Sequence, residues 1–241
     1  MAQPKSELHL PAPLDPVQAE QQGRALVTDL LGQKPAQNST NSGRLLVREA
    51  DRKQRDIPVS FLVLTGGDSW QNIYQTTGTG AGSGLTLTII HSDARPNQYL
   101  LVGPVSPEAT NAGSRKLRAN QTMVPFAGSD FWIADLGLEF FHWPKQLLLK
   151  QEMRRGQSCN VIESVNPQPV PGAYSRVVSW IDIDSGGIVH ADAYDARNEL
   201  LKQFDPKEFK KVHGQWQLQE MEIRNRQTGS RTRVEFNLEQ P

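Results

Sequence analysis

The sequence has little cysteine, no excess charge of either sign and no long apolar run, and each absence excludes a class of protein. A single cysteine, Cys159, excludes an intramolecular disulfide. The 26 basic and 26 acidic side chains cancel, whereas nucleic-acid-binding proteins usually carry a basic patch. We therefore expect no nucleic-acid partner. No uninterrupted apolar run approaches the roughly 18 residues that a membrane-spanning helix requires.

Catalytic and cofactor-binding motifs are also scarce. Residues 78–84, GTGAGSG, are rich in glycine, but they precede the alternating residues 85–90, which are typical of a strand. A phosphate-binding loop opens onto a helix instead, so residues 78–84 are predicted to form a hairpin loop. The chain lacks the Gly-x-Ser-x-Gly motif of hydrolases, and Cys159 lies within a predicted strand, where it acts as a small buried residue. We expect no cofactor and no enzymatic activity.

The densest set of potential metal ligands is Asp182, Asp184, His190, Asp192 and Asp195. A calcium-binding EF-hand starting at Asp182 would need ligands at its fifth and twelfth positions, where this chain has glycine and alanine. The favoured alternative is a hairpin that carries His190 and Asp192 on a solvated outer face, with Val189, Ala191 and Ala193 pointing inward. No metal site is therefore predicted, and a metal-dependent enzyme remains the competing hypothesis.

The chain is predicted to form one domain, residues 15–241, after an extended lead in residues 1–14. The lead contains three prolines and little periodicity. Asp15 and Pro16 then form a helix start, since aspartate caps free backbone N–H groups and proline suits the first helical position. Gly32 marks the end of this helix.

Alternating apolar and polar residues predict strands through most of the remaining chain. Before the middle of the chain, strands are predicted at 44–50, 57–65, 69–77, 84–92 and 98–103, followed by a long loop at 104–125. Later strands are predicted at 146–154, 157–165, 174–183, 188–195, 200–204, 210–213, 216–224 and 232–238. Few helices lie between them, which indicates antiparallel meanders rather than a parallel sheet.

Residues 126–144, FAGSDFWIADLGLEFFHWP, concentrate aromatic residues in a chain that is 7% aromatic overall. We predict a helical segment whose apolar residues cover more than one stripe, so it requires burial on more than one side. Both ordinary core packing and the covering of a bound ligand would satisfy this requirement. Glu139 and His142 are expected on its solvated side, with a histidine–carboxylate pair as the alternative.

Several short motifs of the second half share their order and spacing with a known family. They are residues 126–131 (FAGSDF), 135–136 (DL), 174–182 (YSRVVSWID), 194–195 (YD), 200–202 (LLK), 214–216 (GQW), Met221 and 225–228 (NRQT). Together they resemble the outer membrane lipoprotein-sorting protein family, which has a LolA/LolB-like fold. The resemblance and the strand spacing imply a mainly β, open antiparallel half-barrel of about 11 strands, with helices covering its concave face.

The resemblance also implies a function: a periplasmic carrier, or chaperone, that binds acyl chains of a lipoprotein or another lipid for transport towards the outer membrane. The expected cavity residues are Val59, Phe61, Val63, Leu85, Leu87, Ile89, Val178 and Trp180 on strands, and Phe131, Trp132, Leu136, Phe140 and Phe141 on the cover. A one-residue shift of a strand would invert its inward face. An inner-membrane transporter or an outer-membrane acceptor is a candidate partner, and we expect an export signal to be missing from this sequence. The alternative is an envelope sensor or scaffold of the same fold that binds a membrane protein.

Overall fold

The computed structural model describes residues 15–78, 84–92, 95–104, 112–212 and 215–238. The predicted lead, residues 1–14, and most of the predicted glycine loop, residues 79–83, lie outside the described residues. The boundary between lead and domain therefore stays a prediction.

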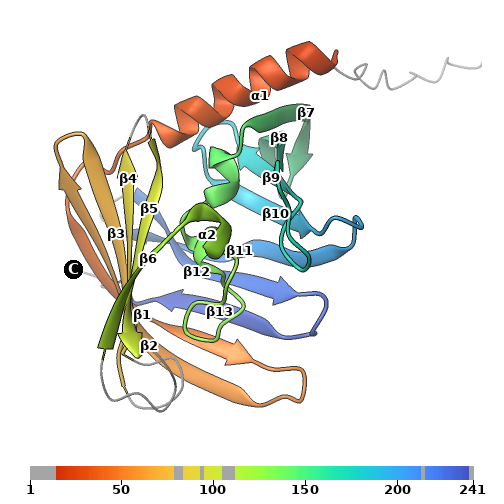
Figure 1. The fold of residues 1–241 in the computed structure, drawn as a ribbon. Helices are drawn as coiled ribbons and strands as arrows, with labels where there is room; N and C mark the ends of the chain where they lie inside the picture. Colours follow the sequence, from red (N-terminus) through yellow and green to blue (C-terminus); the bar gives the residue numbers. More distant parts are fainter. Residues whose placement is uncertain (1–14, 79–83, 93–94, 105–111, 213–214, 239–241) are drawn as a thin grey trace, which may run out of the picture.

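Thirteen strands form one continuous antiparallel sheet that does not close on itself (Figure 1). The first six are β1 (Ser39–Arg48), β2 (Gln54–Gly66), β3 (Ser69–Thr76), β4 (Thr86–Ser92), β5 (Arg95–Pro104) and β6 (Ala112–Leu117). The others are β7 (Lys145–Arg154), β8 (Gln157–Val165), β9 (Arg176–Asp182), β10 (Ile188–Tyr194), β11 (Leu200–Val212), β12 (Gln215–Asn225) and β13 (Arg231–Phe236). The predicted mainly β, antiparallel, open architecture is confirmed.

The strand order places two strands that are consecutive in the chain at opposite edges of the sheet. The order is β6-β5-β4-β3-β2-β1-β13-β12-β11-β10-β9-β8-β7, because β1 pairs with β13 in the middle. We call β1–β6 the first arm and β7–β11 the second arm. Residues 118–144, the connector, link β6 to β7, so they must run from one edge of the curved sheet to the other.

The connector contains three short helical turns rather than the helical segment predicted over residues 126–143. They are η1 (Ala119–Gln121), α2 (Ile133–Leu136) and η2 (Glu139–His142). Ala127, Gly128 and Leu138 adopt positive φ angles, a conformation that interrupts a right-handed helix. Figure 1 shows α2 lying between the two arms. Two of these turns, α2 and η2, lie within residues 126–143, so the predicted helical segment is present only as two short, separate turns.

Two further differences concern strands. Residues 104–125 were predicted as a loop but include β6, whose sequence AGSRKL lacks apolar alternation. Charged residues such as Arg115 and Lys116 are typical of edge strands, where they discourage pairing with another chain.

Strand β11 is continuous through Pro206 because the register shifts beside this residue, and bulges are where proline is tolerated in strands.

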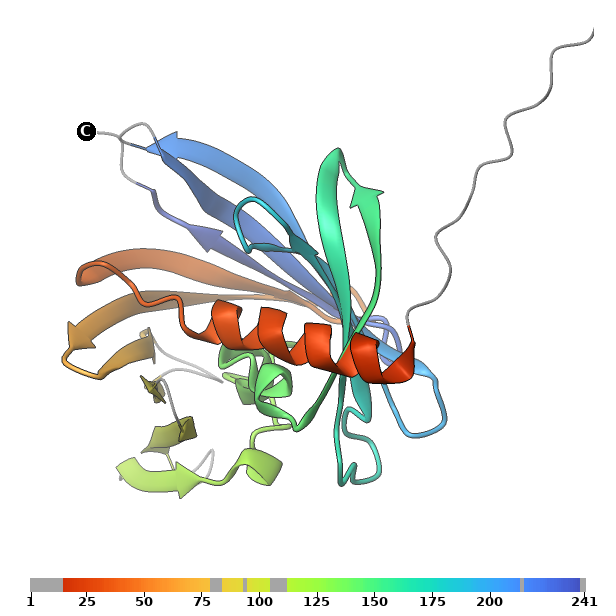
Figure 2. The ribbon, with the colours of Figure 1, turned by 90° about the horizontal axis from the view of Figure 1, so that it is seen from above.

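The N-terminal helix α1 (Pro16–Leu31) packs on β7 and so covers one edge of the sheet. Its cap is the predicted one: the Asp15 carboxylate accepts hydrogen bonds from the N–H groups of Val17 and Gln18. A Cβ atom at Gly23 would lie 2.6 Å from the carbonyl oxygen of Gln146, so this close approach requires glycine. Figure 2 shows α1 extending across one end of the sheet, over both arms.

Candidate ligand cavity

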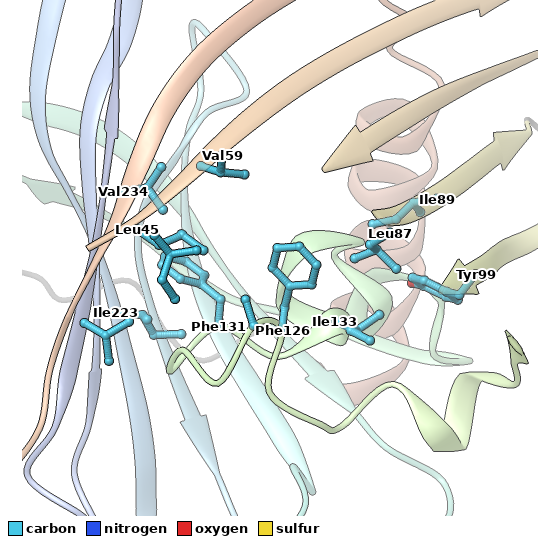
Figure 3. Packing of buried hydrophobic residues seen from close by; sticks show 13 residues of the cluster. Leu45, Val59, Leu87, Ile89, Tyr99, Phe126, Phe131, Ile133, Ile223 and Val234 are labelled. Atoms are coloured by element: carbon cyan, nitrogen blue, oxygen red, sulfur yellow. The ribbon is translucent and has the colours of Figure 1, made fainter. Parts of the chain in front are cut away.

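The inner face of the first arm is filled by side chains of the connector. Val59, Leu87 and Ile89 are buried in one cluster with Phe126 and Ile133. Figure 3 shows these connector side chains between β1, β2 and β13 on one side and β4 and β5 on the other. This part of the concavity is therefore protein core.

A cavity of about 280 Å³, the central cavity, lies between this cluster and a second cluster that includes the inner face of the second arm. It is lined by Asn72, Tyr74, Phe131, Asp135, Leu136, Leu138, Phe140, Tyr174, Val177, Ile188, Ala191, Ala193, Lys202, Phe204, Met221 and Ile223. Most of these side chains are apolar or aromatic. The volume is close to the lower end of the roughly 300–1,000 Å³ found for small-molecule sites.

Small side chains on β9 and β10 explain why the second arm leaves space. Ala191 pairs with Ser179, and Ala193 pairs with Val177, on the inner face of these strands. On the neighbouring strand, Ala191 lies opposite Phe204. Alanine and serine reach less far into the concavity than the leucine and isoleucine residues of the first arm, so space remains beside them even though Phe140 and Phe141 of the connector pack in the same buried cluster.

One end of the central cavity carries a buried ion pair. Lys202, only 2% exposed, donates a hydrogen bond of 2.6 Å from Nζ to the carbonyl oxygen of Asp130 and lies 3.6 Å from Asp135 Oδ2. Its Nζ also lies 3.6 Å from the centre of the Trp132 ring. Burial lowers the pKa of Lys202 to about 8, although Asp135 acts in the opposite direction, and burial raises the pKa of the Asp135 carboxyl.

Polar contacts tie the connector to both arms. Towards the second arm, the Tyr174 hydroxyl donates to Asp135 (2.9 Å). In the middle of the sheet, the Thr232 hydroxyl of β13 donates to the Asp130 carboxylate (2.8 Å). Towards the first arm, the Tyr99 hydroxyl donates to Glu139 Oε2 at 2.6 Å. Such buried, satisfied networks specify one arrangement of the chain, so the connector has a defined position over the sheet.

Two further pockets adjoin the central cavity. The helix pocket, about 630 Å³, is lined by α1, by β3–β5 and by the connector, and it shares Asn72 and Leu138 with the central cavity. The side pocket, about 390 Å³, shares Leu138, Ile188 and Phe204 with it. Leu138 therefore lines all three, and it does so with a φ of 48°, a conformation that is uncommon for leucine.

The predicted cavity residues are divided among several environments. Phe131, Leu136 and Phe140 line the central cavity. Val59, Leu87 and Ile89 are buried in the first cluster, with Phe61 and Leu85 packed against it, and Val63 shares their face by alternation along β2. Phe141 is buried in the second cluster, with Trp132 packed against it.

Val178 and Trp180 were expected on the cavity wall, but they lie on the outer face of β9. Trp180 pairs with His190, and Val178 pairs with Asp192, whereas the intervening Val177 lines the cavity. The Trp180 indole N–H donates to Glu152. The inward face of this strand is thus shifted by one residue from the prediction.

The outer face of β10 is less solvated than predicted. His190 is 4% exposed, with Nδ1 2.8 Å from Asp205 Oδ1 and Nε2 2.9 Å from Asp192 Oδ1. Ala191 and Ala193 are directed inward, as predicted. Asp182 accepts hydrogen bonds from the N–H and hydroxyl groups of Ser185. No group of three or more histidine, cysteine or acidic side chains suited to a metal ion occurs among the described residues.

Glu139 and His142 also differ from their predicted solvated positions. Glu139 is 3% exposed, and burial raises the pKa of its carboxyl. Burial lowers the pKa of His142, whose Nε2 is buried without a hydrogen-bond partner in the described part of the chain. Cys159 is fully buried within β8, in agreement with its predicted role.

The residues that the sequence prediction missed are the small and polar ones of the cavity. Lys202 belongs to the quoted motif of residues 200–202, but its strand is of mixed character, LLKQF, and does not distinguish it from a surface lysine. Ala191 and Ala193 were predicted to point inward, but the prediction did not use their small size, which could have indicated a space beside them. Tyr174 belongs to the quoted motif, yet its contact with Asp135 depends on the folded connector.

Comparison with known proteins gives a family and a fold. Residues 110–239, more than half of the chain, match the model of a family described as uncharacterized protein. No curated protein sequence matches.

Solved structures with a similar fold include a DUF1329 family protein from Desulfovibrio piger (18% identity, TM-score 0.71, 91% of this chain and 92% of that chain). Another is classed as an outer membrane lipoprotein-sorting protein domain from Vibrio parahaemolyticus (18% identity, TM-score 0.73, 90% and 91%). A third is a LolA superfamily protein from Nitrosomonas europaea (14% identity, TM-score 0.59, 91% and 91%). The predicted resemblance to lipoprotein-sorting proteins with a LolA-like fold is confirmed at the level of fold.

Proposed function

Because the chain belongs to this family of uncharacterized proteins and has a LolA-like fold, we propose that it is a non-enzymatic carrier of lipid acyl chains. The observation that supports this most directly is the apolar central cavity between the sheet and the connector. The expected environment is the periplasm, with transfer of a lipid or lipoprotein towards the outer membrane. None of the helices in the described ranges has the length and apolar character needed to cross a bilayer.

The physical basis is burial of hydrocarbon without directed chemistry. Each buried methylene contributes about 0.8 kcal/mol, so one chain in the central cavity would bind with useful affinity. Its volume of about 280 Å³ suits a single chain rather than several. In this proposal the connector, with α2 and η2, serves as the cover of the concave face, and Phe131, Leu136 and Phe140 contact the ligand.

The proposal is tested by filling the cavity. Replacing Ala191 with leucine adds volume to the cavity wall without adding charge, and we expect at least about tenfold weaker binding of a fluorescent fatty-acyl probe, the equivalent of about 1.4 kcal/mol. The matched control is Ala119→Leu, because Ala119 is exposed in η1. Both variants should retain the wild-type circular dichroism spectrum.

Three outcomes matter. Loss of binding in Ala191→Leu alone supports the cavity as the site. Equal binding by both folded variants and the wild type would move the lipid elsewhere, and absence of binding to any acyl probe would remove the carrier function. Substitution of Trp132 or Phe140 by aspartate is a poorer test, since Trp132 stacks on Tyr174 and Phe140 is buried, so the fold itself would suffer.

A further inference from the structure

The helix pocket differs from the central cavity in its polar lining. It includes Arg95 from β5 and Arg24 from α1, and Arg24 also pairs with Glu20 at 2.7 Å. The described residues that line the pocket include no aspartate or glutamate. Trp70 and His91 form a stacked pair on its wall, with ring centres 4.9 Å apart and planes within 10° of parallel. These features suit a group that carries negative charge and accepts hydrogen bonds.

One buried nitrogen of the pocket residues lacks a partner in the described part of the chain. It is His142 Nε2, from a residue that lines the helix pocket. Buried polar groups are nearly always paired, so this nitrogen indicates that a hydrogen-bonding group of a further molecule completes the site.

The position of the pocket connects it to the proposed acyl site. Asn72 and Leu138 line both the helix pocket and the central cavity. Building on the proposed function, we infer that the helix pocket binds the anionic headgroup, a phosphate or a carboxylate, of a lipid whose chain occupies the central cavity. Arg95 would attract the headgroup, Arg24 would do so in addition to its ion pair with Glu20, and the His142 imidazole would donate a hydrogen bond from Nε2 to one of the anionic oxygens.

The opposite orientation, with the headgroup at Lys202, is less favoured by the geometry. The Lys202 ammonium already contacts the Asp130 carbonyl and the Trp132 ring, and Asp135 lines the cavity beside it. A second carboxylate or phosphate there would face the Asp135 carboxylate, and like charges at short range repel. The ion pair is therefore suited to closing the end of the cavity that would hold the end of the acyl chain, and not the end that would hold the headgroup.

The test compares ligands that have the same decyl chain but different headgroups. We would measure the dissociation constants of decyl phosphate, decanol and decyltrimethylammonium, below their micelle concentrations, for the wild type and for Arg24→Gln/Arg95→Gln. Decyl phosphate should bind about tenfold more tightly than decanol to the wild type, and decyltrimethylammonium more weakly. The double variant should lose this preference while its affinity for decanol stays the same. Arg118→Gln, an exposed arginine outside the pocket, is the matched control.

A second measurement follows the pKa of the His91 imidazole. Burial, with His142 nearby, lowers the pKa of His91 to about 4, and an anion in the pocket should raise it, because it stabilises the protonated ring. NMR titration should show this increase with decyl phosphate but not with decanol.

The outcomes separate this inference from the proposed function. The headgroup site is wrong, and the acyl cavity stands, if decanol binds but the headgroup does not change the dissociation constant. The same conclusion follows if the preference for decyl phosphate over decanol persists in Arg24→Gln/Arg95→Gln. If a folded Lys202→Met/Asp135→Leu variant alone loses the preference, the lipid binds in the opposite orientation and the inference is overturned. If inorganic phosphate competes with decyl phosphate but not with decanol, the headgroup site in the helix pocket is supported. If inorganic phosphate binds as tightly as decyl phosphate, the pocket is a site for free phosphate and the inference fails. If none of the decyl compounds binds, the carrier function fails as well.

Discussion

The two arms of the sheet have the same antiparallel construction but meet the connector differently. The inner face of the first arm carries large aliphatic residues, such as Leu87 and Ile89, which contact Phe126 and Ile133 and leave little space. The second arm presents Ala191 and Ala193 to the cavity. The comparison shows that a hollow site in this fold is set by side-chain size on a few inward positions, since the backbone arrangement is shared.

The second arm holds the connector through an ion pair and the first arm through a hydrogen bond. Removing the ion pair should give the largest change in the free energy of unfolding. Replacing Lys202 with methionine would leave the Asp135 carboxylate buried without its cation, which should lower the free energy of unfolding by about 3–5 kcal/mol. Tyr99→Phe, on the first arm, removes a hydrogen bond to Glu139 and should cost about 1–3 kcal/mol. Urea denaturation of both variants measures the difference.

The double variant Lys202→Met/Asp135→Leu sharpens this result. If the cost arises from an unpaired charge, removing both charges should recover much of the lost stability. A double variant as unstable as Lys202→Met alone would show instead that Lys202 acts through its packing.

The second prediction uses two aliphatic residues of α2. Ile133 is buried in the filled part, and Leu136 lines the central cavity. We expect Ile133→Ala to lower the free energy of unfolding by about 3–4 kcal/mol, because it leaves a void in close-packed surroundings. Leu136→Ala should cost only about 1–2 kcal/mol, because its side chain already borders empty space and has fewer contacts to lose. Equal costs, measured by chemical denaturation, would show that the two parts of the interior are packed alike.

The sequence was informative where one face of a strand is clearly apolar. Strand β8 has the predicted limits, residues 157–165, and Val59 and Leu87 lie on the inner face as expected. Strand β9 reads RVVSWID, with buried residues on both faces, so alternation could not show whether Val177 or Val178 points inward.

The cavity and the connector depend on contacts that a local pattern does not contain. The helix predicted over residues 126–143 fails at Gly128 and Leu138, whose left-handed backbone fits the path from one sheet edge to the other. The central cavity is a difference in volume between two surfaces brought together by the fold. Composition suggested an apolar interior, but it could not show which arm would be filled.

The third prediction concerns His91, which lines the helix pocket beside the first arm. The pKa of His91 is lowered from 6.5 to about 4 because the ring is largely buried. Between these two values the unfolded chain binds more protons than the folded protein, so the free energy of unfolding should fall as the pH falls through this window, by on the order of 2 kcal/mol. The His91→Gln variant should show a weaker dependence, with His142 contributing the remainder in the same direction. An identical pH profile for both proteins would show that His91 is not the titrating group.

The smallest expected effect comes from adding volume to each arm. Ala191→Val places two more carbon atoms in the space beside the second arm and should change the free energy of unfolding by less than about 1 kcal/mol, with stabilisation as the expected sign, because apolar surface is buried without displacing a neighbour. Val59→Ile adds one carbon atom where the side chain is 2% exposed in the filled cluster, and overpacking there should cost about 1 kcal/mol or more. The signs are more informative than the sizes, since opposite signs require that one arm has space and the other has none. If Ala191→Val is the more destabilising of the two, the second arm is as full as the first, and an acyl chain could enter only by moving the connector.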